Sequence, residues 1–130
     1  MTGDANSGFG RVTLEANTTG GQNTAIGYAA LNANTTANDN TAVGYLALLS
    51  NTTGTQNTAV GSLAGDAITT GLRNTAIGYG TLSVATTAND NTAVGQTALN
   101  ATTSGENNTA VGKSALVATL QVKTIRQLVL

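Results

Sequence analysis

The feature of this sequence that most constrains its fold is a short repeat of constant, 17-residue period. The motif Asn-Thr-Ala-(Val/Ile)-Gly begins, with no insertion between copies, at Asn23, Asn40, Asn57, Asn74, Asn91 and Asn108. One period before the first of these, "NSGFG" from Asn6 is a degenerate copy, and one period after the last the motif is lost at Ile125. Self-similarity at a fixed short period is typical of stacked structural units. The sequence therefore predicts a repeat domain over residues 1–116, with coils starting at 6, 23, 40, 57, 74, 91 and 108, and a separate segment over 117–130.

The length and composition of the period favour an all-β fold. One period is too short for two helices and a turn. Each period contains Gly, Thr and Asn in stretches such as "NANTTAND", and these residues favour turns over helix interiors. We therefore expect a parallel β-solenoid, or β-roll, of about seven coils, each with two short strands joined by polar turns.

Two aliphatic positions recur in every period and are the candidates for the core. The fourth residue of each motif is predicted to lie inside: Ile26, Val43, Val60, Ile77, Val94 and Val111, with Phe9 in the degenerate copy. The ninth position is occupied by Leu14, Leu31, Leu48, Leu82, Leu99 and Leu116. Gly65 interrupts this second column, and we expect Ile68 to fill the space.

The invariant Asn and Gly of the motif are expected to be structural. Parallel stacking places equivalent residues of neighbouring coils about 4.8 Å apart, so the Asn side chains can bond to one another as a ladder. The motif glycines are predicted to provide a positive φ or a close backbone approach: Gly27, Gly44, Gly61, Gly78, Gly95 and Gly112. Because the adjacent Ala column is also small, we expect a second chain to pack against this Ala/Gly surface.

The composition excludes several classes of function. The chain has no His and no Cys, so common metal ligands, acid–base groups and thiol nucleophiles are absent. We expect no enzyme activity, no catalytic residue, no metal and no cofactor. Five Lys and Arg residues and a net charge of −1 argue against nucleic-acid binding. No apolar run approaches the length of a membrane span, so we expect no membrane insertion of this segment.

The acidic residues suggest two kinds of site, and both are disfavoured. Asp39 and Asp90 occupy the same repeat position three coils apart, about 14 Å by stacking, whereas a glycosidase pair needs about 5–9.5 Å. The "NDN" segments at 38–40 and 89–91 could bind calcium, but a role in turns is favoured because Asn and Asp commonly form turns.

Other side chains have competing interpretations. Tyr28, Tyr45 and Tyr79 are candidate surface contacts for a sugar or protein, or rings packed on a neighbouring turn. The Thr18 column and the adjacent Thr19 column suggest ice binding, although adjacent residues of a strand point to opposite faces. Glycosylation sequons begin at Asn17, Asn34, Asn51, Asn100 and Asn107, as chance would produce in a Thr/Asn-rich repeat.

The repeat resembles a known family. The segments "NTAIGYAAL" (23–31), "NTAVGYLAL" (40–48) and "NTAVGQTAL" (91–99) are similar to the "NSVAIG"-type repeats of the YadA-like head of trimeric autotransporter adhesins, and more so to the "GNTAVGYQAL" repeats of phage tail-fibre proteins. The likeness covers roughly residues 6–116. It implies a left-handed parallel β-roll with three identical chains side by side. The adhesin repeat is typically shorter than the repeat of this chain, so binding carried by its loops cannot be transferred.

The C-terminal segment departs from the repeat. Ala118, Val122, Ile125 and Val129 have a heptad-like spacing, which fits a coiled-coil neck, whereas a strand capping the roll is the alternative. Taken together, the sequence predicts a non-enzymatic module of a homotrimeric surface fibre, either a phage tail fibre or a bacterial adhesin head. We expect it on a virion or cell surface, where it binds a glycan or protein receptor or acts as a stiff spacer. Ice binding through stacked Thr columns is the alternative function.

Overall fold

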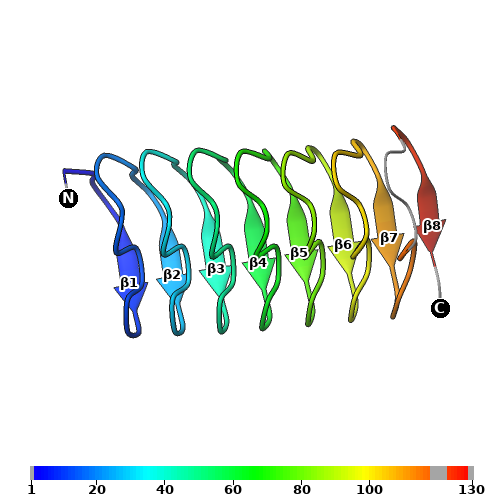
Figure 1. The fold of residues 1–130 in the computed structure, drawn as a ribbon, viewed down its shortest axis with the longest axis horizontal. Helices are drawn as coiled ribbons and strands as arrows, with labels where there is room; N and C mark the ends of the chain where they lie inside the picture. Colours follow the sequence, from blue (N-terminus) through cyan, green and yellow to red (C-terminus); the bar gives the residue numbers. More distant parts are fainter. Residues whose placement is uncertain (1, 118–122, 129–130) are drawn as a thin grey trace.

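The chain folds into a parallel β-solenoid built on a single sheet. The computed structural model describes residues 2–117 and 123–128. Each coil contributes one three-residue strand, and the strands lie side by side in sequence order along the long axis (Figure 1). They are β1 (Ser7–Phe9), β2 (Thr24–Ile26), β3 (Thr41–Val43), β4 (Thr58–Val60), β5 (Thr75–Ile77), β6 (Thr92–Val94), β7 (Thr109–Val111) and β8 (Arg126–Leu128). No helix is present in the described part of the chain. The predicted all-β parallel solenoid is confirmed.

The register of the sheet follows the sequence repeat. Each strand pairs in parallel with the equivalent residues of the next coil, as in Thr24 with Thr41 and Ala25 with Ala42. The pairing continues after the motif is lost, because Thr109 of β7 pairs with Arg126 of β8. The sheet therefore extends beyond Leu116 and ends in a strand, while Ala118, Val122 and Val129 of the coiled-coil alternative lie outside the described residues.

The expectation of two strands per coil is wrong, because the segment after each strand is a chain of turns. In the second coil the Ala30 N–H donates to the Gly27 carbonyl, the Asn32 N–H to the Ala29 carbonyl and the Asn34 N–H to the Leu31 carbonyl. Ala29 and Leu31 have φ angles of 54° and 50°, in the left-handed region. Left-handed residues alternating with right-handed ones bend the backbone continuously, so no second strand forms there.

The interior contains alanines from the strands and leucines from the turns. The middle residue of each central strand is completely buried, as Ala42 and Ala59 show at 0% exposure. The Leu column is buried as predicted from Leu14 to Leu99, and Leu116 is partly buried, although its members adopt the costly left-handed conformation. Burial of a Leu side chain, worth about 1.5–3 kcal/mol, offsets a backbone strain of about 1–2 kcal/mol.

One coil fills the Leu position differently, as the sequence predicts. Gly65 stands in the Leu column with a φ of 59°, and Ile68 of the same coil is fully buried. A Cβ placed on Gly65 would lie 3.0 Å from Ile68 Cδ1 and 3.2 Å from Leu48 Cδ2. Ile68 therefore occupies the space that a leucine fills in the other coils.

The placement of the Val/Ile column in the core is wrong for the single chain. Adjacent residues of a strand point to opposite faces, and in β2 to β7 the Ala points inward. The motif's fourth residue therefore points outward: Ile26, Val60 and Ile77 are 43%, 37% and 39% exposed, and Val43, Val94 and Val111 are partly exposed. For the same reason the Ala column is interior and cannot be the surface on which a second chain packs.

The motif glycines serve both of the roles expected from the sequence. Gly61 has a φ of 134°, and Gly44 and Gly78 have similar positive values. A Cβ on Gly61 would lie 2.7 Å from the carbonyl oxygen of Gly78 in the next coil. A side chain at this position would therefore strain the backbone and also push neighbouring coils apart.

Candidate interaction surface

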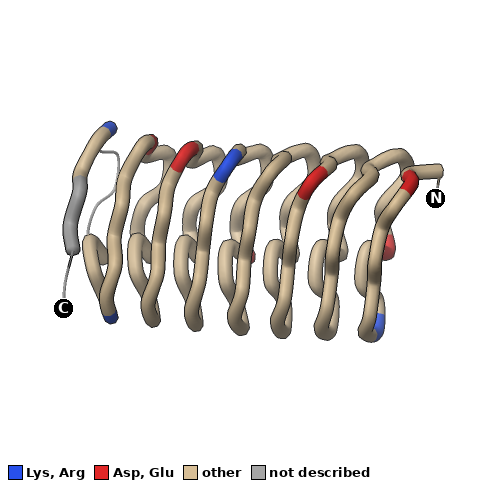
Figure 2. The backbone as a smooth tube through the Cα atoms, turned by 180° about the vertical axis from the view of Figure 1, so that it is seen from behind, with Lys and Arg blue, Asp and Glu red and all other residues tan. Residues whose placement is uncertain are grey.

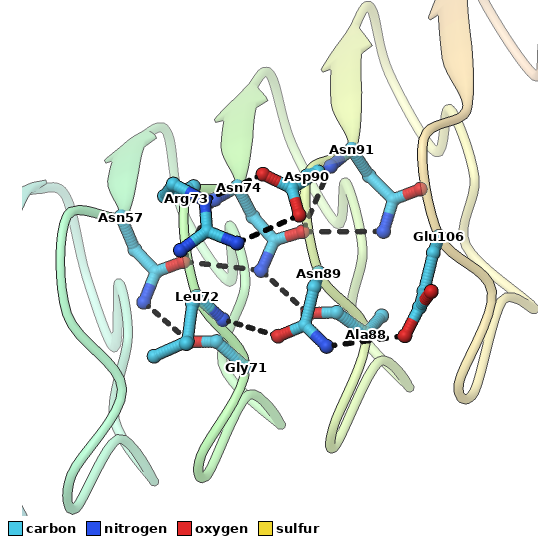
Figure 3. A network of polar contacts seen from close by, with 10 residues as sticks. All are labelled: Asn57, Gly71, Leu72, Arg73, Asn74, Ala88, Asn89, Asp90, Asn91 and Glu106. Carbon is cyan, nitrogen blue, oxygen red and sulfur yellow. Dashed lines mark hydrogen bonds and ion pairs between the residues drawn. The ribbon is translucent and has the colours of Figure 1, made fainter.

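The invariant asparagines form a hydrogen-bonded ladder inside the solenoid (Figure 3). Asn57 Nδ2 donates to the Gly71 carbonyl at 2.8 Å, and Asn57 Oδ1 accepts from both the N–H and the Nδ2 of Asn74, at 2.9 and 3.1 Å. The backbone bonds of this pattern recur from Asn23 through Asn91, and the Ile125 N–H donates to Asn108 Oδ1 at 2.9 Å. Since the ladder is buried and its atoms are bonded, it holds the coils together and is not a site for a ligand.

A second ladder consists of asparagines that sequence reasoning treated only as chance sequons. Asn34 Nδ2 donates to Asn17 Oδ1 at 2.8 Å, and Asn51 Nδ2 donates to Asn34 Oδ1 at 3.1 Å. All three are buried, and the run ends where Ile68 replaces the next asparagine, which leaves Asn51 Oδ1 without a partner. Their spacing of one repeat period was the signal that could have identified this ladder from the sequence.

The threonines that suggested ice binding do not form a two-column array of free hydroxyls. Thr18 Oγ1 donates to the Thr35 carbonyl of the next coil at 2.9 Å, and Thr35 Oγ1 donates to the Thr52 carbonyl at 3.1 Å. Thr52 and Thr69 continue the series. These hydroxyls are therefore used to connect neighbouring coils, whereas the members of the adjacent Thr19 column are exposed.

The first residue of β2 to β7 provides a different threonine column. Because strand side chains alternate, it shares the outer face with the Val/Ile column. Thr24, Thr41, Thr58, Thr75 and Thr92 are partly exposed, and their hydroxyls have no hydrogen-bond partner in the described part of the chain. The outer face of the sheet thus carries parallel columns of threonine and of valine or isoleucine, repeated at about 4.8 Å.

This outer face carries a column of apolar side chains that the described part of the chain leaves exposed. Its apolar column begins at Phe9, which is 79% exposed, and continues with valine or isoleucine along the central strands. Parallel sheets normally have both faces covered, whereas here only the inner face is covered within the chain. Contiguous exposed apolar surface of this kind marks interaction sites.

The predicted tyrosines lie beside this face, on the turn that follows the strands. Tyr28, Tyr45 and Tyr79 are 43%, 53% and 53% exposed. The rings of Tyr28 and Tyr45 stack on each other with their centroids 5.6 Å apart and their planes at 17°. Their surface position is consistent with a contact role.

The charged residues are few and spread out (Figure 2), and Asp90, one of the two acids considered for a glycosidase pair, has a structural partner. Arg73 forms a two-pronged ion pair with Asp90 of the next coil, at 2.6 and 2.9 Å (Figure 3). The Arg73 guanidinium lowers the pKa of Asp90, first through its hydrogen bond. Sequence reasoning missed this pair, although its members stand one repeat period apart.

The "NDN" segments use their oxygens for bonds between coils. Asn38 Oδ1 accepts the Gly21 N–H at 2.7 Å, and Asn89 Oδ1 accepts the Leu72 N–H at 2.9 Å. Within residues 2–117 and 123–128, no three Asp or Glu side chains gather into a group that could hold a metal ion. The geometry therefore favours the turn and stacking role of these segments.

Asp66 is a partly buried acid with no ion-pair partner in the described part of the chain. Burial raises the pKa of Asp66, while hydrogen bonds from the backbone N–H groups of Asp66 and Ala67 act in the opposite direction. Its Oδ1 atom is buried without a partner. The same column holds Asn32 and Asn100, whose Nδ2 groups donate to the Val12 and Gly80 carbonyls at 2.9 Å. Asp66 has no such donor, so it is a local weakness in the stack.

Comparison of the chain with protein-family models, curated proteins and solved structures finds no match. No helix in the described residues is long and apolar enough to span a membrane. The outer face of the sheet and the adjoining tyrosines therefore stand as the candidate site on their own geometry.

Proposed function

We propose that this chain is a non-enzymatic segment of a homotrimeric surface fibre, in which the outer face of the sheet packs against two identical chains. The observation that carries the proposal is the uncovered aliphatic column on a parallel sheet, from Phe9 through Val60 to Ile77. A second copy offers the same flat, regularly spaced surface, so residues of like spacing meet along the whole length of the solenoid. Burial of this column removes apolar area from water at about 25 cal/mol per Å².

The finer features of the proposal come from the resemblance of the repeats to adhesin heads and phage tail fibres. These are a left-handed roll and three chains about one axis, whereas the seven 17-residue coils come from the repeat of this chain itself. Such a segment rises only about 30 Å, which suits a stiff spacer or a short adhesive tip on a virion or cell surface. The receptor of an adhesive tip would be a glycan or a protein.

The test is the mass of the chain in solution, measured by light scattering on a sizing column. A trimer near three times 12.9 kDa is expected. Val60→Lys places a charge in the centre of the outer face and should give a monomer. Gln56→Lys adds the same charge on an exposed turn at the end of the preceding coil and should leave the trimer intact. A monomeric wild-type chain, or a trimer that Val60→Lys does not weaken, would refute this interface.

The spacer and adhesive roles are separated by a second measurement. The isolated trimer, labelled with a fluorophore, should adhere to cells in a saturable manner if it is an adhesive tip. A trimer that shows no saturable binding to any cell type is a spacer.

Ice binding remains the second candidate function because of one specific observation. The threonine hydroxyls of the strands are free, and they alternate with methyl-bearing Val and Ile in a regular array on the outer face. The candidate array for this function is therefore the Thr24 column in place of the Thr18 column. Since the same face cannot contact both ice and other chains, a monomer with thermal hysteresis that Thr58→Lys abolishes would favour this function over the fibre.

A further inference from the structure

The turn after each strand presents one outward residue per coil, and these residues form a column along the solenoid. The column contains three tyrosines, and Ser62 separates the second from the third. The column runs Arg11, Tyr28, Tyr45, Ser62, Tyr79, Gln96 and Lys113. The backbone stays in register across the interruption, because the Leu63 N–H donates to the Tyr45 carbonyl at 2.9 Å and the Gly80 N–H to the Ser62 carbonyl at 3.1 Å. Tyr45, Ser62 and Tyr79 therefore occupy the same place on three successive coils.

The stacked pair shows how rings lie in this column. Tyr28 and Tyr45 are nearly parallel, at 17°, with centroids 5.6 Å apart, so their faces are turned along the solenoid axis. One face of Tyr45 is covered by Tyr28, and the opposite face is directed toward the next coil, where Ser62 is too short to cover it. Tyr45 and Tyr79, which flank the serine, are each 53% exposed, compared with 43% for Tyr28.

The distance across the interruption fits one saturated six-membered ring. Coils about 4.8 Å apart place residues two coils apart at about 9.6 Å. A ring held between two aromatic faces makes carbon–carbon contacts of about 3.5–4 Å on each side, so the two faces must be at least about 7–8 Å apart. The thickness of a puckered ring adds to this separation and brings it close to the spacing of two coils.

We propose that Tyr45 and Tyr79 hold a hexopyranose ring of a neutral glycan between them, above Ser62. The Ser62 hydroxyl has no hydrogen-bond partner in the described part of the chain, so it is free to bond a sugar hydroxyl at the base of the gap. The residues of the gap carry no charge, and the charged members of the column, Arg11 and Lys113, lie at its two ends. A neutral sugar is therefore a better fit than an acidic one. This assignment deepens the proposed function and rests on it, because it names the receptor class of the fibre.

The test uses the full chain and saturation-transfer NMR with the methyl glycosides of glucose, galactose, mannose and N-acetylglucosamine, and with indole as a flat aromatic probe. At least one glycoside should receive saturation on the protons of one ring face. Ser62→Tyr fills the gap with a third stacked ring and should weaken that binding at least tenfold, although it adds aromatic surface. Gln96→Tyr adds the same ring to the same column beside Tyr79 but leaves the gap open, so it should bind as the wild type does.

Tyr79→Ala removes one wall of the gap and should also weaken binding at least tenfold, which provides a second variant if Ser62→Tyr does not fold by circular dichroism. Equal or stronger binding by Ser62→Tyr would show general aromatic adhesion and overturn the proposal. Binding of indole alone, or of no probe, would overturn the sugar assignment. The solution mass is measured on the same samples, which separates the two proposals. A monomer that still binds a glycoside would refute the trimer and support the sugar site. A trimer that binds no glycoside would support the fibre and refute the sugar site.

Discussion

Replacing one rung of the Asn ladder tests whether hydrogen bonds between coils, and not only apolar burial, hold the solenoid together. We choose Asn57→Ala, in the middle of the stack. The substitution removes the donor to the Gly71 carbonyl and the acceptor of the Asn74 N–H. Asn74 Nδ2 keeps a partner, because it also donates to the Ala88 carbonyl at 2.7 Å.

The expected loss follows from the two backbone groups that remain without partners. Asn57 is 1% exposed, so water does not reach the vacated position freely. Each buried unsatisfied group costs about 1–3 kcal/mol, which gives about 2–6 kcal/mol for the pair. A typical domain has a free energy of unfolding of about 5–15 kcal/mol. One rung therefore accounts for a large part of the stability of the fold.

The assay is urea unfolding followed by circular dichroism, combined with amide hydrogen exchange. Asn38→Ala is the matched control, because it loses a single bond to the Gly21 N–H at an exposed site where water can replace it. We expect the control to lose about 1 kcal/mol or less, and we expect faster exchange at the Asn74 amide in Asn57→Ala only. Equal losses for the two variants would refute the view that the buried ladder stabilises the stack.

Three further predictions concern other columns. Gly61→Ala should destabilise the fold by about 3 kcal/mol in urea unfolding, because its Cβ meets a backbone oxygen at 2.7 Å in a left-handed conformation. Gly65→Leu alone should overpack the core and destabilise the fold. Adding Ile68→Asn should restore stability, because it vacates the space for the leucine and its amide reaches the unpaired Asn51 Oδ1. A double-mutant cycle in urea unfolding should therefore show favourable coupling, and additive losses would contradict this interpretation. Asp66→Asn should stabilise the chain by about 1 kcal/mol at pH 7 by supplying the missing donor. Because burial raises the pKa of Asp66, the wild type gains stability as the pH falls through that raised pKa. The difference in unfolding free energy between Asp66→Asn and the wild type should therefore be smaller in acid than at pH 7. Urea midpoints of both proteins, measured at pH 7 and in acid, will show this.

The repeat period was enough to predict the parallel solenoid, because a fixed spacing has a direct geometric meaning: equivalent residues stack. The same reasoning correctly predicted that Ile68 compensates for Gly65. It also located the Asn and Gly columns, whose roles follow from their chemistry alone. These predictions needed only which residues lie above one another.

What the period could not reveal is which way each residue points within a coil. In the strand "TAV", either Ala or Val can face inward, and the larger side chain was the natural choice for the core. The structure chooses alanine because the opposite wall of the narrow coil is already filled by leucines such as Leu48. Those leucines reach inward from left-handed turns, a conformation that propensity disfavours and that burial compensates. The outer aliphatic face therefore came from the structure and not from the sequence.

Because both Asn ladders and the strand pairing join each coil only to its two neighbours, the molecule can change length in whole coils. Removing residues 57–73 would bring Asn74 directly against Asn40, and each would find the partner atoms it already uses. The same deletion removes Gly65 and Ile68 together, because both lie in this coil, so neither is left without the residue that compensates for it. Insertion or deletion of a single residue would instead shift that coil out of register, so its asparagines would no longer stack on those of the neighbouring coils. The 17-residue coil is thus the unit by which such a chain can be lengthened or shortened during evolution.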